Sequence, residues 1–189
     1  MKRSLLALSL AATLPFAAAH AAQGISYNHV EAGYAATNAD GDADGFGLNA
    51  SVAVHPNFHL FGGWSNQDID HSSADFDQWR IGVGYNHEIS PNADLVTRLA
   101  YEKFDAGGGL DPDGYSVEVG VRGAMLPQLE GHAMVGYEDY GSDAYFEYGD
   151  DFYGRLGAVW KFTPNWGVSG DVKFVSGDTQ WFVGPRFTW

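Results

Sequence analysis

The chain has 189 residues, no cysteine and a formal net charge of −14 at pH 7. This acidic balance argues against nucleic acid as a partner, and the lack of cysteine excludes a disulfide framework and thiol chemistry. Aromatic residues make up 15% of the chain and glycines number 25, in short alternating stretches that favour an all-β barrel or sandwich.

The chain begins with a segment typical of a signal peptide. A basic start at Met1–Arg3 is followed by an apolar stretch, Leu5–Ala19, and by the small-residue motif Ala19-His20-Ala21. We expect cleavage after Ala21, which leaves one domain, residues 22–189. Cleavage removes two basic residues and no acid, so the charge of the remaining chain falls from −14 to −16.

Four short turns recur along the domain, at spacings of 35, 36 and 37 residues. They are Pro56-Asn57, Pro91-Asn92, Pro127-Gln128 and Pro164-Asn165. Proline cannot continue a strand ladder and favours turns, so each turn joins two strands. Residues 29–34 and 180–189 also alternate with period two, which predicts ten strands. The first of these runs has the least defined register, and eight strands remain the alternative.

The last ten residues predict how the sheet closes. Trp181, Phe187 and Trp189 occupy alternate positions of one apolar face. The final strand of an outer-membrane barrel pairs with the first strand, and its aromatic side chains lie at the membrane interface. An edge strand of a secreted sandwich is the alternative for this segment.

The connections between the hairpins differ from the short turns. The segments 37–45, 67–77, 105–114 and 139–151 are long and rich in acids, and they contain no lysine or arginine. Short turns on one rim and long polar loops on the other are typical of an outer-membrane barrel. We therefore predict an antiparallel up-and-down transmembrane β-barrel with short periplasmic turns and long acidic extracellular loops.

Outward-facing aromatic residues form two predicted bands, as expected at two membrane interfaces. Trp64, Trp79, Tyr101, Tyr115 and Trp181 are expected near the long loops, and Trp160, Trp166, Phe187 and Trp189 near the short turns.

The charged residues of the strands are predicted to face the lumen, because a charge facing lipid at mid-depth costs about 2–4 kcal/mol. The predicted network contains Arg80, Glu102, Arg98, Glu118, Arg122, Glu130, His132, Arg155, Asp171, Lys173 and Arg186. The turn positions imply that Arg80 faces Glu102 and that Arg122 faces His132. Such a network forms either a structural plug or an ion-selective pore.

Two other patterns concern metal binding and catalysis. Asp40, Asp42 and Asp44 match the start of a calcium loop, but the bidentate glutamate expected at its end is replaced by Ser51. We expect weak binding of calcium or magnesium there and no other cofactor. Asp70 lies beside a histidine, yet no Asp-x-His pair occurs, so a membrane-embedded hydrolase is the weaker alternative and no enzyme activity is expected.

The chain also resembles a known family along its whole length. The resemblance rests on Ser26-Tyr27-Asn28, VHPNF at 54–58, FDQWR at 76–80, GYEDY at 136–140, WGVSGDVK at 166–173 and DTQWFVGPRF at 178–187. It is similar to the small porin-like and OmpA-like outer-membrane barrels of xanthomonads that are named as activators of plant immunity and regulated by diffusible signal factor. The resemblance implies an outer-membrane protein that is also shed in vesicles and is linked to biofilm and virulence.

From these observations we expect a monomeric, non-enzymatic barrel that acts in envelope integrity, surface interaction, biofilm or virulence. The main alternative is a narrow porin for small ions or solutes. The expected partners are outer-membrane lipids and lipopolysaccharide, together with the barrel-assembly machinery. By family resemblance, that machinery reads a terminal aromatic residue such as Trp189.

Overall fold

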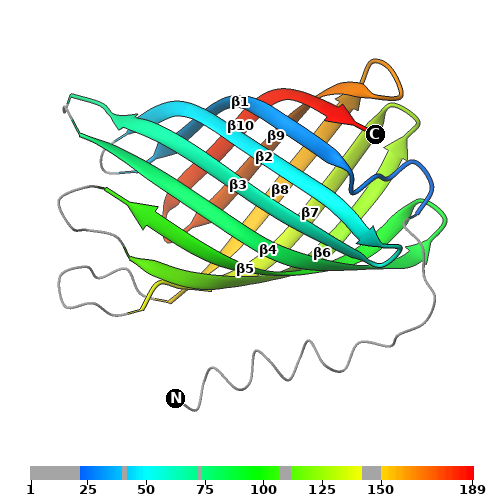
Figure 1. Cartoon of the computed structure of the whole chain (residues 1–189), viewed down its shortest axis with the longest axis horizontal. Helices are drawn as coiled ribbons and strands as arrows, with labels where there is room; N and C mark the ends of the chain where they lie inside the picture. Colours follow the sequence, from blue (N-terminus) through cyan, green and yellow to red (C-terminus); the bar gives the residue numbers. More distant parts are fainter. Residues whose placement is uncertain (1–21, 40–41, 72–73, 107–111, 142–149) are drawn as a thin grey trace, which may run out of the picture.

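The computed structural model describes residues 22–39, 42–71, 74–106, 112–141 and 150–189, and the strands in these ranges form one closed barrel (Figure 1). The strands are β1 (His29–Asn38), β2 (Ala43–His55), β3 (Phe58–Ile69), β4 (Asp75–Ser90), β5 (Ala93–Asp105), β6 (Asp113–Leu126), β7 (Leu129–Asp139), β8 (Asp151–Lys161), β9 (Trp166–Val175) and β10 (Asp178–Thr188). Within these ranges, no helix is long and apolar enough to cross a membrane. The expected signal peptide, residues 1–21, lies outside the described residues.

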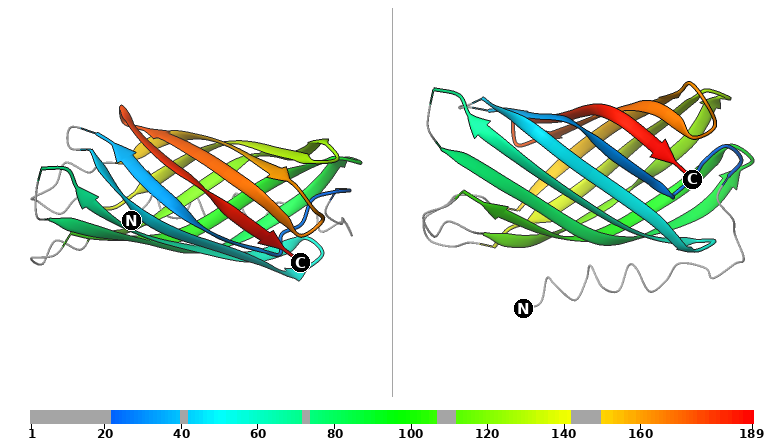
Figure 2. Two further views of the ribbon diagram at one scale, coloured as in Figure 1. Left: turned by 90° about the horizontal axis from the view of Figure 1, so that it is seen from above. Right: turned by 45° about the horizontal axis from the view of Figure 1, so that its top comes forward.

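The sheet is antiparallel throughout, and each strand pairs with its neighbours in the chain. β1 also pairs with β10, with Val30 opposite Phe187 and Tyr34 opposite Val183. This pairing closes the barrel, as Figure 2 shows from two further sides. The prediction of a ten-stranded closed barrel is confirmed, and the alternatives of eight strands and of a sandwich are wrong.

Polarity alternates across the wall of the barrel. In β6, Val119 and Val121 are exposed on the outside, whereas Ser116, Glu118 and Arg122 are buried on the inside. Apolar side chains therefore cover the outer surface, and polar ones fill the interior. This is the reverse of a soluble protein and suits a barrel surrounded by lipid.

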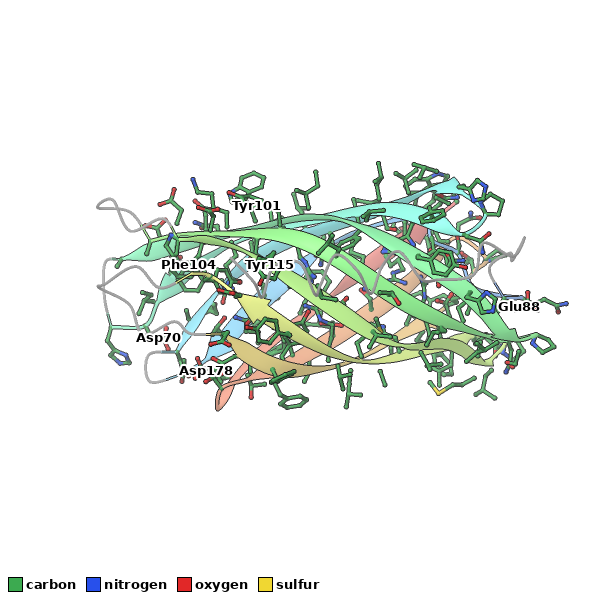
Figure 3. The ribbon with its side chains drawn as sticks, turned by 90° about the horizontal axis from the view of Figure 1, so that it is seen from below. Asp70, Glu88, Tyr101, Phe104, Tyr115 and Asp178 are labelled. Carbon is green, nitrogen blue, oxygen red and sulfur yellow. The ribbon has the colours of Figure 1, made fainter. Side chains whose placement is uncertain are left out.

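The two rims differ as the sequence predicts. The short turns gather at one end, on the right in Figure 1, and the long connections gather at the other. Figure 3 shows Asp70 and Asp178 at the long-connection end and Glu88 at the short-turn end. The turn between β9 and β10 is also tight, and Gly177 takes a φ of 95° there, which glycine adopts without steric cost.

The asparagines of the short turns tie each hairpin to the next. Asn57, between β2 and β3, donates through Nδ2 to the carbonyl oxygen of Asn86 in β4 at 2.9 Å. Asn92 and Asn165 donate in the same way to β6 at 3.1 Å and to β10 at 2.8 Å. At the third turn the carbonyl oxygen of Gln128 accepts from β8 at 2.7 Å. The repeat therefore stabilises the barrel at its rim.

Candidate functional site in the barrel lumen

Charged side chains from strands all around the barrel point inward. The cations are Arg80 in β4, Arg98 in β5, Arg122 in β6, Arg155 and Lys161 in β8, Lys173 in β9 and Arg186 in β10. The acids that meet them are Glu31 in β1, Glu102 in β5, Glu118 in β6, Glu130 and Glu138 in β7, and Asp171 in β9. Their inward register follows from the period of two along each strand.

Glu118 is the centre of this network, with an exposed fraction of only 1%. Its carboxylate accepts from Arg98 Nη1 at 3.1 Å and from the hydroxyl of Tyr153 at 3.0 Å. Arg155 Nε lies 3.7 Å from its second oxygen. Two guanidinium groups from β5 and β8 thus share one carboxylate on β6: Arg98 faces Glu118 on the adjacent strand, whereas Arg155 reaches it past β7.

The network continues on both sides of Glu118. Arg155 Nη1 lies 3.8 Å from Asp171, whose other oxygen is 2.8 Å from Nε2 of His132. Arg80 and Glu102 stand opposite each other in the β4–β5 register, with 3.4 Å between Nη2 and Oε1. The predicted register of this pair is confirmed.

Two further ion pairs hold other parts of the wall. Lys173 Nζ lies 2.5 Å from Glu138, which joins β9 to β7 across the intervening strand. Arg186 Nε donates to Glu31 at 2.5 Å and so joins the last strand to the first. Every one of these groups is at least partly removed from water. An unpaired charge in such a buried position is costly.

The predicted pairing of Arg122 with His132 is confirmed in the β6–β7 register. The side-chain ion pair of Arg122, however, is with Glu130 at 2.6 Å. Lys161 also pairs with Glu130 and donates to the carbonyl oxygen of Gly24 at 2.6 Å. This cluster lies near the short-turn rim and contacts the segment that precedes β1.

That segment, residues 22–28, enters the short-turn mouth of the barrel. The ring of Tyr27 stacks on His59 at 4.4 Å, and the guanidinium of Arg122 lies 4.8 Å from its centre. The Tyr27 hydroxyl donates to Asp94 Oδ2 at 2.9 Å. Burial raises the pKa of Tyr27, so the phenol keeps its proton and remains a donor.

A cavity of about 210 Å³ lies inside the barrel. Three guanidinium nitrogens of its lining, Arg80 Nε, Arg80 Nη2 and Arg155 Nε, are buried without a hydrogen-bond partner. The ring of Phe61 lies between two of the cations, 5.3 Å from Arg80 and 5.3 Å from Arg98. The wall therefore concentrates positive charge around the cavity, and two of these nitrogens, Arg80 Nη2 and Arg155 Nε, lie within ion-pair distance of Glu102 and Glu118.

Glycines on neighbouring strands make room for the large inward side chains. A Cβ at Gly84 would lie 2.1 Å from Nε2 of His59, and a Cβ at Gly136 would lie 2.2 Å from Cζ of Tyr153. Both distances are far below van der Waals contact. These rings can fill the lumen only because the facing residue lacks a side chain.

The acidic loop predicted to bind cations is only partly described. Asp40 lies outside the described residues, Asp42 accepts from Asn38 Nδ2 at 3.2 Å, and Asp44 lies in β2. Within the described ranges, no group of three His, Cys, Asp or Glu side chains could hold a metal ion. Asp70 lies at the same rim, and its main-chain nitrogen donates to the carbonyl oxygen of Asp42 at 2.8 Å.

The outward aromatic side chains contact one another within each rim. At the long-connection end, Trp64 lies 6.0 Å from Trp79, and Tyr101 projects from the wall in Figure 3. At the short-turn end, Phe187 lies 5.0 Å from Trp166 and 6.2 Å from Trp189. Rings that meet in this way form continuous apolar surface near each end of the barrel.

Sequence reasoning missed four contributors to the lumen. Phe61 and His59 share the inward parity of β3, so alternation could have identified them. Tyr27 lies before the first alternating run and carried no such signal. Asp94 was not predicted to contribute to the lumen, although its exposed fraction is 0%.

The chain matches the model of the Gram-negative porins over residues 4–107. It is similar in fold to the KdgM porin, with 15% identity, a TM-score of 0.47, and coverage of 85% of this chain and 99% of that one. It is also similar to the outer membrane protein OprG from Pseudomonas aeruginosa, with 13% identity, a TM-score of 0.42, and coverage of 89% and 99%. A comparison with curated proteins gives no match.

Proposed function

Because the chain belongs to the Gram-negative porin family, we propose that its barrel is a narrow outer-membrane pore that favours small anions. The family model describes porins, so the chain is an outer-membrane barrel of porin type. The direction of selectivity rests on the cavity wall. The cavity volume of about 210 Å³ is below the roughly 300–1,000 Å³ of pockets for drug-sized ligands, so the expected solutes are small ions.

The arrangement of charge around the cavity carries this proposal. Inward-facing cations outnumber carboxylates in the cavity lining, because several of the inward acids do not line the cavity. The lining includes Arg80, Arg98, Arg122, Arg155, Lys173 and Arg186, but of the described inward acids only Glu31, Glu102 and Asp171. A permeating ion therefore meets guanidinium groups first, and charge-lined constrictions select ions of opposite sign.

Reversal potentials in planar bilayers test the proposal. With a KCl gradient across the membrane, the purified protein should conduct. Its reversal potential should lie closer to the equilibrium potential of chloride than to that of potassium. Arg80→Met should move that potential toward potassium, because it removes a cation from the wall. Arg80→Lys keeps the charge and should retain most of the selectivity. Absence of conductance, or a preference for potassium, would contradict the proposal and favour a salt-bridge plug.

The acidic long-connection rim favours a second role at the cell surface. Asp42, Asp68, Asp75, Asp105 and Asp178 all lie at that end. Such a rim repels bare phosphate and can contact lipopolysaccharide through bridging divalent cations. We propose that the rim contributes to envelope integrity, biofilm and virulence, as the resemblance to the xanthomonad family implies. A deletion strain complemented with loop-neutralised protein should remain defective in biofilm and detergent resistance, and full rescue would exclude this role.

A further inference from the structure

Asp94, at the start of β5, is a buried carboxylate with an unusual set of partners. Its Oδ1 accepts from the main-chain nitrogen of Ala22 at 2.9 Å, and its Oδ2 accepts from the Tyr27 hydroxyl at 2.9 Å. Both donors are neutral in the uncleaved chain. Among the described residues, no ion pair joins Asp94 to a lysine or arginine, although Arg122 stands opposite it in the β5–β6 register and pairs instead with Glu130. Glu31, Glu102, Glu118, Glu130, Glu138 and Asp171 each have one.

A fully buried carboxylate without a cationic partner is costly. The nitrogen beside Oδ1 belongs to the residue that the expected cleavage after Ala21 would make the first of the mature chain. Hydrolysis of that peptide bond consumes one water, leaves a carboxylate on the released peptide and leaves a protonated α-amine on Ala22. The amine is largely charged near neutral pH, and it would lie where Asp94 lacks a cation.

We propose that Asp94 is the binding site for the α-ammonium group that signal-peptide removal creates on Ala22. The rest of the segment is already positioned for this contact. Gln23 donates from its main chain to the carbonyl oxygen of Pro91 at 2.8 Å. Ile25 packs in a buried cluster with Val96 and Met134. Figure 1 shows the start of the coloured chain at the short-turn end of the barrel.

The consequence is an anchored N-terminal plug, which we call the N-terminal clasp and define by Ala22, Tyr27 and Asp94. Processing converts a hydrogen bond from a neutral amide to the carboxylate into a buried ion pair between an ammonium group and the carboxylate. Residues 22–28 are then fixed in the short-turn mouth at their first residue as well as at β1. The clasp does not depend on whether the lumen conducts, so its test is separate from the bilayer measurement.

The test is the chemical reactivity of the α-amine in protein purified from outer membranes. An acylating reagent is applied at neutral pH to the folded protein and to the same protein in urea, and peptide mass mapping follows each amine. The mass spectrum should first show Ala22 at the N-terminus. The folded protein should then be acylated there at least about tenfold more slowly, a factor that corresponds to about 1.4 kcal/mol.

Three variants make the result specific. Asp94→Asn keeps the shape of the side chain and one acceptor oxygen but removes the charge and the second acceptor, and it should lose most of the protection. Glu88→Gln is the matched control, because Glu88 faces Asp94 in the β4–β5 register yet is exposed; it should remain protected. A refolded chain extended by Gly-Gly before Ala22 keeps every native side chain and should react as fast as unfolded protein.

The extended chain decides the question if Asp94→Asn does not fold. An N-terminus other than Ala22, rapid acylation of the folded wild type, or equal protection in the extended chain would each overturn the clasp.

Discussion

Glu118→Gln should destabilise the barrel more than any other single conservative change in the lumen. Glutamine has the same shape, so no cavity forms, but it removes the negative charge that faces two arginines. In the variant, Arg155 would retain its ion pair with Asp171 at 3.8 Å. Arg98 would lose its ion pair with the Glu118 carboxylate at 3.1 Å. Breaking a buried ion pair by removing one partner costs about 3–5 kcal/mol. We expect a loss in that range.

The assay is urea unfolding of protein refolded into lipid vesicles, followed by tryptophan fluorescence. The matched control is Glu88→Gln, the same chemical change at an exposed position of the short-turn rim, which should alter the free energy of unfolding by less than about 0.5 kcal/mol. If Glu118→Gln costs no more than this control, the central cluster does not hold the barrel together and the magnitude argued from its burial is wrong.

Three further predictions concern the rims and the last strand. Asn57→Ala should lower the free energy of unfolding by about 1–2 kcal/mol, because it leaves the Asn86 carbonyl oxygen without its donor. Gln128→Ala should change it by less than about 0.5 kcal/mol, since that turn bonds β8 through its main chain; equal losses would refute the role of the asparagine. Trp189→Ser should reduce the amount inserted in cells more than the yield refolded into detergent, and normal insertion would argue against recognition of the terminal aromatic residue. Calcium should bind weakly, with a Kd of roughly 10⁻⁴–10⁻³ M by calorimetry, and changing Asp40, Asp42 and Asp44 to Asn should abolish the heat; unchanged heat would exclude this loop.

The fold was largely predictable because its signals are local. Proline turns recur at 35, 36 and 37 residues, and the residues between them alternate, so both the strand number and the register follow. Less visible were the register shifts beside the first three turns, such as the one between Ala53 and His55. A shift confined to the last residues of a strand leaves the alternation before it unchanged, and the sequence pattern therefore does not reveal it.

The lumen was predictable in composition but not in its contacts. Because side chains alternate between the two faces of a strand, the sequence identifies the charges that point inward. The register between adjacent strands, read from the turn positions, identifies pairs such as Arg80 with Glu102. The contacts of Glu118 with Arg155, and of Glu138 with Lys173, skip a strand. They depend on the width and tilt of the closed barrel, which no local pattern encodes. Residues 22–28 escaped prediction for a similar reason, because a segment without periodicity has no predicted face.

Charge balance links the N-terminal clasp to the selectivity of the pore. Within the ion-pair network of the described residues, seven cations face six acids, and Asp94 is the seventh acid, so this set of charges is balanced in the uncleaved chain. If the α-ammonium of Ala22 takes Asp94, six acids remain for seven cations, and one positive charge is in excess. Arg80 and Arg155 line the cavity, so an anion that enters it would meet this excess charge. Glu118→Gln adds a second unmatched cation, so any folded fraction of that variant should prefer chloride more strongly than the wild type. A shift toward potassium would show that buried carboxylates do not set the potential inside the cavity.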